Sequence, residues 1–350
     1  MKKKMLALLC VSAMVAGLVG CGEKEAPATS DPAPTTEAAD DVEDTADDAE
    51  EPVADAGDLI AVGIINNDPS ESGYRTANVE DMKRVFTEDN GYSAKFAYSL
   101  KNEEQIEAAQ KMIQDGIDYL LLSAADTSGW DTVLQDAADA GTQVILFDRT
   151  IDADESLYVA SVVSDMAKEG ETAVAWLADQ GLDEYNVIHI QGAMGSAAQI
   201  GRSGALTAKA DAEANWNIVE EQTATWDATT AQQIVEAVIT AGKSFNVIYA
   251  ENDDMAKGAV AALDAANITH GVDGDVIVMG FDCNKYALQN LVDGTWNYDG
   301  QCNPFQASTI DGIIKQLEEG ETLSEKVIIL DEKGFDAKTI TAEDVDNYGI

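Results

Sequence analysis

The stretch VILFDRT, Val144–Thr150, decides the fold. Its first four residues form a continuous apolar run, which is typical of a strand buried on both faces of a parallel sheet. Such a strand ordinarily ends in Gly, Asn or Ser, but here the opposite charges of Asp148 and Arg149 follow. In open parallel sheets, ligands bind beyond the carboxyl ends of the strands. The stretch therefore predicts a parallel α/β fold with a polar site at this end of the sheet.

The same pattern recurs along the chain, because short apolar runs alternate with longer stretches of helical periodicity. This alternation predicts right-handed βαβ units and a doubly wound sheet. Nine strands are too many for one open sheet of this length, so we expect an α/β protein with two doubly wound parallel-sheet, Rossmann-like lobes of about 130 residues each. The expected strands are 59–65, 94–100, 119–124, 143–148, 158–163, 186–192, 217–224, 246–252 and 275–282.

The first 57 residues differ in composition from the rest. Residues 1–21 contain three lysines and then an apolar run, as in an export signal that is too short to span a bilayer. The run ends in Leu-Val-Gly-Cys, similar to a bacterial lipobox that would make Cys21 the lipidated first residue of the mature protein; the alternative is an ordinary secretory signal. Residues 22–57 are rich in Ala, Pro, Thr, Asp and Glu, which predicts a disordered acidic linker.

Charge and cysteine content exclude several classes of partner and site. The net charge of -44 argues against binding to nucleic acid or to an anionic membrane surface. There is no paired Cys-x-x-Cys and there are only two histidines, so we expect no metal and no cofactor. His189 lies within an apolar run and is predicted to be a core histidine. Whether Cys283 and Cys302 form a disulfide stays open.

Polar and aromatic residues follow several of the expected strands. Carboxylates, guanidinium groups and amides there accompany the rings of Tyr74 and Trp226. A sugar hydroxyl both donates and accepts hydrogen bonds, and the apolar face of a sugar packs on an aromatic ring. This inventory favours a sugar site. Alternatively, Asp148 and Arg149 form a structural ion pair, and Asn252 only caps the next helix.

Several motifs in order resemble one known family. They are SESGYRTA (70–77), ADTSGWDTVLQDA (125–137), LFDRTID (146–152), DESLYVASVVSDMAKEG (154–170), QGAMGSAAQIGRSGA (191–205) and YAENDDMAKGAVAAL (249–263). From about residue 58 to 330 the chain resembles type I periplasmic binding proteins of sugar ABC transporters, in the ribose/galactose group and nearest to the galactofuranose-binding branch.

The resemblance implies a set of ligand-binding residues and no catalytic residue. The chain departs from the galactofuranose branch at Gln301, where that branch has an acidic residue, and at Trp226-Asp227-Ala228, where it has Phe-Thr-Arg. The identity of the sugar is therefore not fixed. The implied ligand-binding residues are Ser72, Arg75, Asp148, Arg149, Arg202, Trp226, Asn252, Asp282 and Gln301.

The resemblance also implies how the chain is divided. One lobe would comprise residues 58–162 with 302–331, and the other 163–301 with 332–350. The chain would cross between the lobes near 162–165, near 301–303 and near Leu330, which makes a three-segment hinge.

The expected function is that of a monomeric, lipid-anchored solute-binding protein on the outer face of the cytoplasmic membrane. It would close around a monosaccharide such as galactofuranose, galactose or ribose and deliver it to the permease of an ABC transporter. One alternative is a receptor that presents a sugar or furanosyl signal to a membrane sensor. Another is an enzyme acting on glycosides, but the acids of this chain accompany arginines and amides rather than forming an acid–base pair.

Overall fold

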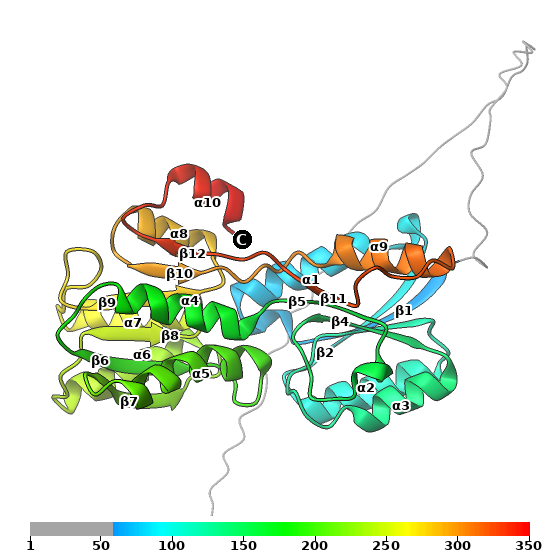
Figure 1. Ribbon diagram of the computed structural model, residues 1–350, viewed down its shortest axis with the longest axis horizontal. Helices are drawn as coiled ribbons and strands as arrows, with labels where there is room; N and C mark the ends of the chain where they lie inside the picture. The colour runs from blue at the N-terminus through cyan, green and yellow to red at the C-terminus, as the bar shows by residue number, and fades with distance from the viewer. Residues whose placement is uncertain (1–58) are drawn as a thin grey trace, which may run out of the picture. The chain divides into compact units, whose positions relative to one another are not determined.

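A computed structural model describes residues 59–350, and these residues form two parallel sheets of six strands each (Figure 1). The first sheet has the order β11-β5-β4-β3-β1-β2, and the second has the order β12-β10-β9-β8-β6-β7. All neighbours are parallel except β12, which pairs antiparallel to β10. The strands are β1 (Ile60–Asn66), β2 (Tyr92–Tyr98), β3 (Tyr119–Leu122), β4 (Gln143–Asp148), β5 (Ala160–Val163), β6 (Tyr185–Gln191), β7 (Trp216–Thr223), β8 (Val247–Ala250), β9 (Ile277–Phe281), β10 (Tyr298–Gly300), β11 (Val327–Ile329) and β12 (Gly334–Asp336).

Helices cover both faces of each sheet, which confirms the predicted fold class. In the first sheet, α1 and α9 pack on one face and α2 and α3 on the other. In the second sheet, α4 and α5 pack on one face and α6, α7 and α8 on the other. The helices are α1 (Gly73–Val85), α2 (Asn102–Gln114), α3 (Asp131–Ala140), α4 (Met166–Ala178), α5 (Ala197–Ala212), α6 (Ala228–Thr240), α7 (Asp253–Ala265), α8 (Lys285–Val292), α9 (Ala307–Glu318) and α10 (Ala342–Tyr348).

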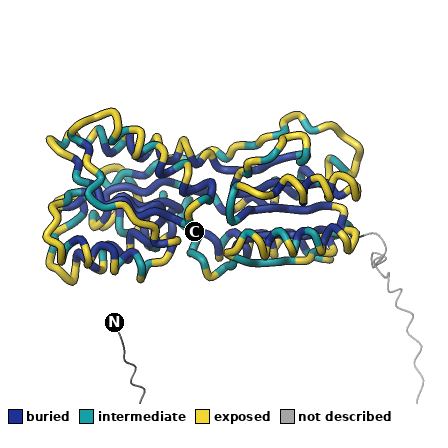
Figure 2. The backbone as a smooth tube through the Cα atoms, turned by 90° about the horizontal axis from the view of Figure 1, so that it is seen from below, coloured by how far each residue is buried: buried dark blue, intermediate teal, exposed yellow. Residues whose placement is uncertain are grey.

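Strand β4 illustrates why the apolar runs are continuous. Ile145 and Phe147 face the core under α1 and α9, whereas Val144 and Leu146 face the core under α2 and α3. Because alternate side chains of a strand point to opposite faces, a strand covered on both sides needs apolar residues at every position. Figure 2 shows the result, with buried strands inside and the exposed parts of the helices outside.

The chain passes between the two sheets three times, through segments that lie side by side (Figure 1). The segments are residues 164–165 between β5 and α4, 301–306 between β10 and α9, and 330–333 between β11 and β12. They are hydrogen-bonded to one another, because Ser164 Oγ and the Asn303 backbone N–H both donate to Glu332 Oε1, at 2.7 and 2.6 Å. The three crossings thus form one bundle between the lobes.

The predicted export signal, Cys21 and the acidic linker lie outside the described residues. In the described part of the chain, no helix is long and apolar enough to span a membrane.

Candidate ligand-binding site

The ends of the strands enclose a cavity between the two lobes, with an empty volume of about 290 Å³. It is lined by Glu71, Ser72, Tyr74, Asp148, Arg149, Met166, Ala198, Arg202, Trp226, Asn252, Asp282 and Cys302.

The backbone is strained where strands end at this cavity. Six non-glycine residues in the described chain have a positive φ, and five of them end a strand of the two sheets or lie within three residues after one. Such a conformation costs roughly 1–3 kcal/mol per residue and is concentrated at functional sites in proteins. The five residues are Asp148 (φ 62°), Thr225 (φ 50°), Trp226 (φ 70°), Asp282 (φ 109°) and Cys283 (φ 61°).

The kink at the end of β4 places Asp148 among three donors from other elements. Its Oδ2 lies 2.7 Å from Arg75 Nη2 and accepts a hydrogen bond from Ser123 Oγ at 2.7 Å. Its Oδ1 accepts from the Tyr74 hydroxyl at 2.8 Å. Burial would raise the pKa of Asp148, but Arg75 and Arg149 outweigh it and hold the pKa below its ordinary value. Asp148 is therefore ionised at neutral pH.

Asp148 belongs to a network of two arginines and two carboxylates. Arg75 Nε lies 3.2 Å from Glu71 Oε2, and Arg149 Nη2 lies 3.4 Å from the same oxygen. Arg149 Nε lies 3.6 Å from Asp148 Oδ2. The formal charges cancel, which buried charges require. The charged strand end is thus a structural ion network, and Glu71, Asp148 and Arg149 also face the cavity.

The second lobe contributes Arg202 from α5. Arg202 Nε lies 2.7 Å from Glu169 Oε2, and Nη2 lies 3.4 Å from Asp282 Oδ1. Arg202 also donates to the backbone carbonyl of Glu251. Burial raises the pKa of both Glu169 and Asp282, and Arg202 offsets this only in part. Arg202 therefore holds the two acids of this wall in place.

The indole ring of Trp226 packs against the backbone of Gly192. A Cβ atom at Gly192 would lie within 2.3 Å of three carbons of the indole ring, so only glycine leaves room for the ring. The guanidinium carbon of Arg149 lies 5.9 Å from the ring centroid and brings the two lobes into contact. Trp226 Nε1 is buried and has no hydrogen-bond partner among the residues described. Trp226 is also one of the residues that line the cavity.

Asn252 combines two roles. Its Oδ1 accepts a hydrogen bond from the backbone N–H of Met255 at 2.8 Å, so Asn252 is the N-cap of α7. The same side chain lines the cavity. The two interpretations of Asn252 from sequence are thus compatible.

The structure places seven of the nine predicted site residues on the cavity wall and two elsewhere. Arg75 is fully buried behind Asp148, which it positions. Gln301 lies in a separate pocket at the interlobe crossings. Glu71 was missed although it adjoins Ser72 in the motif SESGYRTA, whereas Met166 and Ala198 are apolar and gave no signal. Ligand binding by the nine residues stays a prediction.

The lobes contact each other at the rim of the cavity. The Gly73 backbone N–H donates to Asp254 Oδ2 at 3.0 Å, and the Thr127 N–H donates to the Gly195 carbonyl at 3.1 Å. The structure therefore has a closed arrangement, in which groups of both lobes enclose the same space.

The structure also bears on one prediction and one open question from the sequence. His189 is buried, and its ring nitrogens lie 2.9 Å from Glu221 and 2.9 Å from Glu251, as expected for a core histidine. Cys283 and Cys302 are both buried free thiols.

Two α/β lobes, three crossings and a polar cavity between the lobes define the class of two-lobed solute-binding proteins. The chain belongs to the family of proteins with a periplasmic binding protein domain, which it matches over residues 62–322.

Three known proteins illustrate the similarity. The chain is 29% identical to the fructose import binding protein FruE of Bifidobacterium longum over 99% of this chain and 97% of that one. It is 29% identical to the galactofuranose-binding protein YtfQ of Escherichia coli over 74% of this chain and 83% of that one. The periplasmic binding protein of the arabinose ABC transporter from Shewanella sp. ANA-3, solved with α- and β-L-arabinofuranose, superposes with a TM-score of 0.75 at 27% identity, covering 82% of this chain and 95% of that one.

Proposed function

We propose that this protein captures a monosaccharide between its lobes and delivers it to the permease of an ABC transporter. The observation that supports this most is the cavity, because both lobes line it with charged and polar groups whose positions are fixed by their neighbours. The relatives named above import or bind fructose, galactofuranose and arabinofuranose.

The lining matches the needs of a small polyhydroxylated ligand. Carboxylates of Asp148 and Asp282 are acceptors for hydroxyl protons, and the guanidinium groups of Arg149 and Arg202 are donors. The unpartnered Nε1 of Trp226 adds a donor beside an apolar ring. We propose that these residues, together with Ser72 and Asn252, bind the sugar directly, while Arg75 acts through Asp148 and Gln301 acts from the hinge.

Binding would close the lobes by bending the three crossings. A sugar that contacts both lobes binds the closed form more tightly than the open one, so it shifts the population towards the closed form. We propose lobes of residues 58–162 with 302–331 and of residues 163–301 with 332–350. The closed form of this monomer is then the one that the permease recognises.

We propose a binding function without a reaction. The relatives named above are sugar-binding proteins, which supports this proposal. Asp148 is held ionised by two arginines, and the carboxyl group of Asp282 faces Arg202. This arrangement suits hydrogen bonding to a ground-state ligand, so the sugar should be recovered unchanged.

We further propose that Cys21 is lipidated and anchors the protein to the outer face of the cytoplasmic membrane. The lipobox-like sequence before Cys21 supports this proposal. A Cys21→Ser variant should be found in the medium or the soluble extracytoplasmic fraction rather than with membranes; equal membrane association of both forms would contradict anchoring at this residue.

Isothermal titration calorimetry tests the binding function. The panel is D-fructose, D-galactose, L-arabinose and D-ribose, and we expect saturable binding of at least one sugar with one site per chain. Arg149→Met keeps the stem of the side chain but removes a charged donor, which costs about 1.5–3 kcal/mol, or at least tenfold in Kd. Arg84→Met, at a side chain that is 64% exposed, is the matched control.

The control variant should bind as the wild type does. Absence of binding for every sugar on the panel would contradict the monosaccharide proposal, and equal affinities of the Arg149→Met and Arg84→Met variants would contradict the proposed site.

A further inference from the structure

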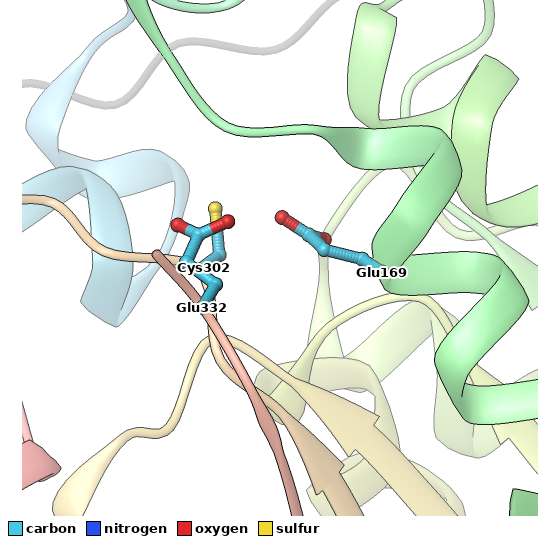
Figure 3. Close-up of side chains that lie close together, drawn as sticks. All are labelled: Glu169, Cys302 and Glu332. Atoms are coloured by element: carbon cyan, nitrogen blue, oxygen red, sulfur yellow. The ribbon is translucent and has the colours of Figure 1, made fainter. Parts of the chain in front are cut away.

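Three side chains with metal-ligating atoms meet at the interlobe crossings (Figure 3). Glu169 comes from α4, Cys302 from the crossing at 301–306, and Glu332 from the crossing at 330–333. One ligand atom from each lies within 4.8 Å of the other two. The cluster thus joins a helix of the second lobe to two of the three connecting segments.

Each of the three side chains has an atom available for a ligand. Glu169 is only 6% exposed, and its Oε1 has no hydrogen-bond partner in residues 59–350, since Arg202 occupies Oε2. Figure 3 shows the Glu169 carboxylate directed towards Cys302 and Glu332. Glu332 Oε1 accepts two hydrogen bonds, whereas none reaches Oε2 from this part of the chain. Cys302 Sγ lies 3.6 Å from Ser164 Oγ.

The unpartnered Glu169 oxygen points to a missing ligand. A buried acceptor without a partner destabilises the fold, and more so when it is charged. In the cluster, two carboxylates and a thiol face one another, and no lysine or arginine other than Arg202 pairs with them among the described residues. A bound cation would satisfy Glu169 Oε1 and offset the mutual repulsion.

We propose that Glu169, Cys302 and Glu332 form a hinge site for a divalent transition metal of the Zn²⁺ class. Thiolate and carboxylate ligands together suit Zn²⁺, whereas Mg²⁺ and Ca²⁺ select oxygen alone. Tetrahedral Zn²⁺ with bonds of about 2.0–2.3 Å places its ligand atoms about 3.5 Å apart. Because the three atoms already lie within 4.8 Å of one another, they have to approach by at most about 1.3 Å, and water takes the fourth position.

A metal ion can reach this site from solvent. Glu169 and Glu332 line a pocket at the crossings with an empty volume of about 630 Å³, where Asp165 adds another carboxylate. On the other side, Cys302 lines the ligand cavity. The metal would therefore sit between the hinge pocket and the cavity, where it fixes the relative positions of α4 and two crossings.

This site could not be recognised in the sequence because its three ligands lie at least 30 residues apart along the chain. A Cys-x-x-Cys or His-x-His spacing marks a site built within one segment. Here the fold brings the ligands together because the crossings at 301–306 and 330–333 pass beside α4.

Binding of Co²⁺ and Zn²⁺ to the full chain, purified with chelator under reducing conditions, tests the proposal. We expect one Co²⁺ per chain, a thiolate-to-cobalt charge-transfer band in the near ultraviolet, and displacement of Co²⁺ by Zn²⁺. Cys302→Ser should remove the band. Glu332→Gln should weaken Co²⁺ binding at least tenfold, and because Glu332 is only partly buried, this variant keeps the test valid if Cys302→Ser does not fold.

Cys283→Ser is the matched control, because Cys283 is the other buried free thiol in the described chain. It should leave Co²⁺ binding and the band unchanged. Absence of the band in the wild type, or its persistence in Cys302→Ser, would overturn the proposal; so would wild-type affinity in Glu332→Gln. Because metal binding itself is measured, none of these results depends on whether the protein binds a sugar.

Discussion

Replacing Asp148 by Asn should destabilise the protein more than any exposed Asp→Asn change. The variant keeps the shape of the side chain but removes one of two negative charges from the network of Glu71, Arg75, Asp148 and Arg149. Removing the charge of one partner in a buried ion pair lowers the free energy of unfolding by about 3–5 kcal/mol. Because Glu71 still contacts both arginines, we expect the lower end, about 3 kcal/mol, which corresponds to roughly 6–12 °C in Tm.

Thermal unfolding followed by circular dichroism measures this difference in the absence of sugar. Asp115→Asn is the control, because Asp115 pairs with Lys95 at 3.2 Å while both side chains are about half exposed. An exposed pair of this kind contributes only about 0–1 kcal/mol. The control should therefore lower Tm by no more than a few degrees.

The pH dependence identifies the cause. The folded-state pKa of Asp148 is lowered, so the ionised carboxylate stabilises the fold above the unfolded-state pKa of about 3.9, and this contribution is lost as pH falls through the folded-state pKa. The Tm difference between wild type and Asp148→Asn should thus be constant near neutral pH and narrow in acid. A variant as stable as Asp115→Asn, or a difference that does not change with pH, would refute the reasoning.

Three further changes test separate parts of the structure. Gly192→Ala should weaken sugar binding at least tenfold while the protein stays folded, measured by calorimetry, because its methyl group displaces the Trp226 ring; unchanged affinity would contradict this placement of the ring. Gly201→Ala should lower stability by about 1–3 kcal/mol in a denaturant titration, because its Cβ would lie 2.5 Å from the Met166 backbone where α4 meets α5; a neutral result would contradict this close packing. Burial lowers the pKa of His189, but hydrogen bonds and charge from two glutamates raise it by more. Protonated His189 therefore stabilises the fold fully below the unfolded-state pKa of about 6.5, and this contribution is lost as the pH rises through the folded-state pKa. The Tm of the wild type should fall over this pH range, whereas the Tm of His189→Gln should not; parallel curves of Tm against pH would contradict this role of His189.

Much of the fold was predictable because burial on both faces imposes a simple pattern. All nine strands expected from apolar runs are present, with ends shifted by a few residues. The three missed strands, β10, β11 and β12, have three residues each and are too short for a periodic signal. Asn102 precedes Gln105 by three residues, a spacing that predicts an N-cap, but it is the first residue of α2, and its amide donates to the Ser128 carbonyl. Tertiary contact therefore decided the helix start.

The candidate site was partly predictable for a related reason. Polar residues directly after apolar runs, such as Asp148, Arg149 and Asp282, stand out in sequence, and the parallel topology brings them to one edge. Arg75 differs because its network with Glu71 and Asp148 depends on how α1 packs beside β4. No sequence pattern reports how these two elements pack, so Arg75 could not be distinguished in sequence from a residue that faces the cavity.

The central claim is that one sugar is held by both lobes in the cavity. The most direct measurement is a crystal structure of the protein with the sugar that binds most tightly in calorimetry. We predict one sugar in the cavity, with hydrogen bonds to Asp148 or Arg149 from the first lobe and to Arg202 or Asp282 from the second. A sugar bound outside the cavity, or touching only one lobe, would contradict the account.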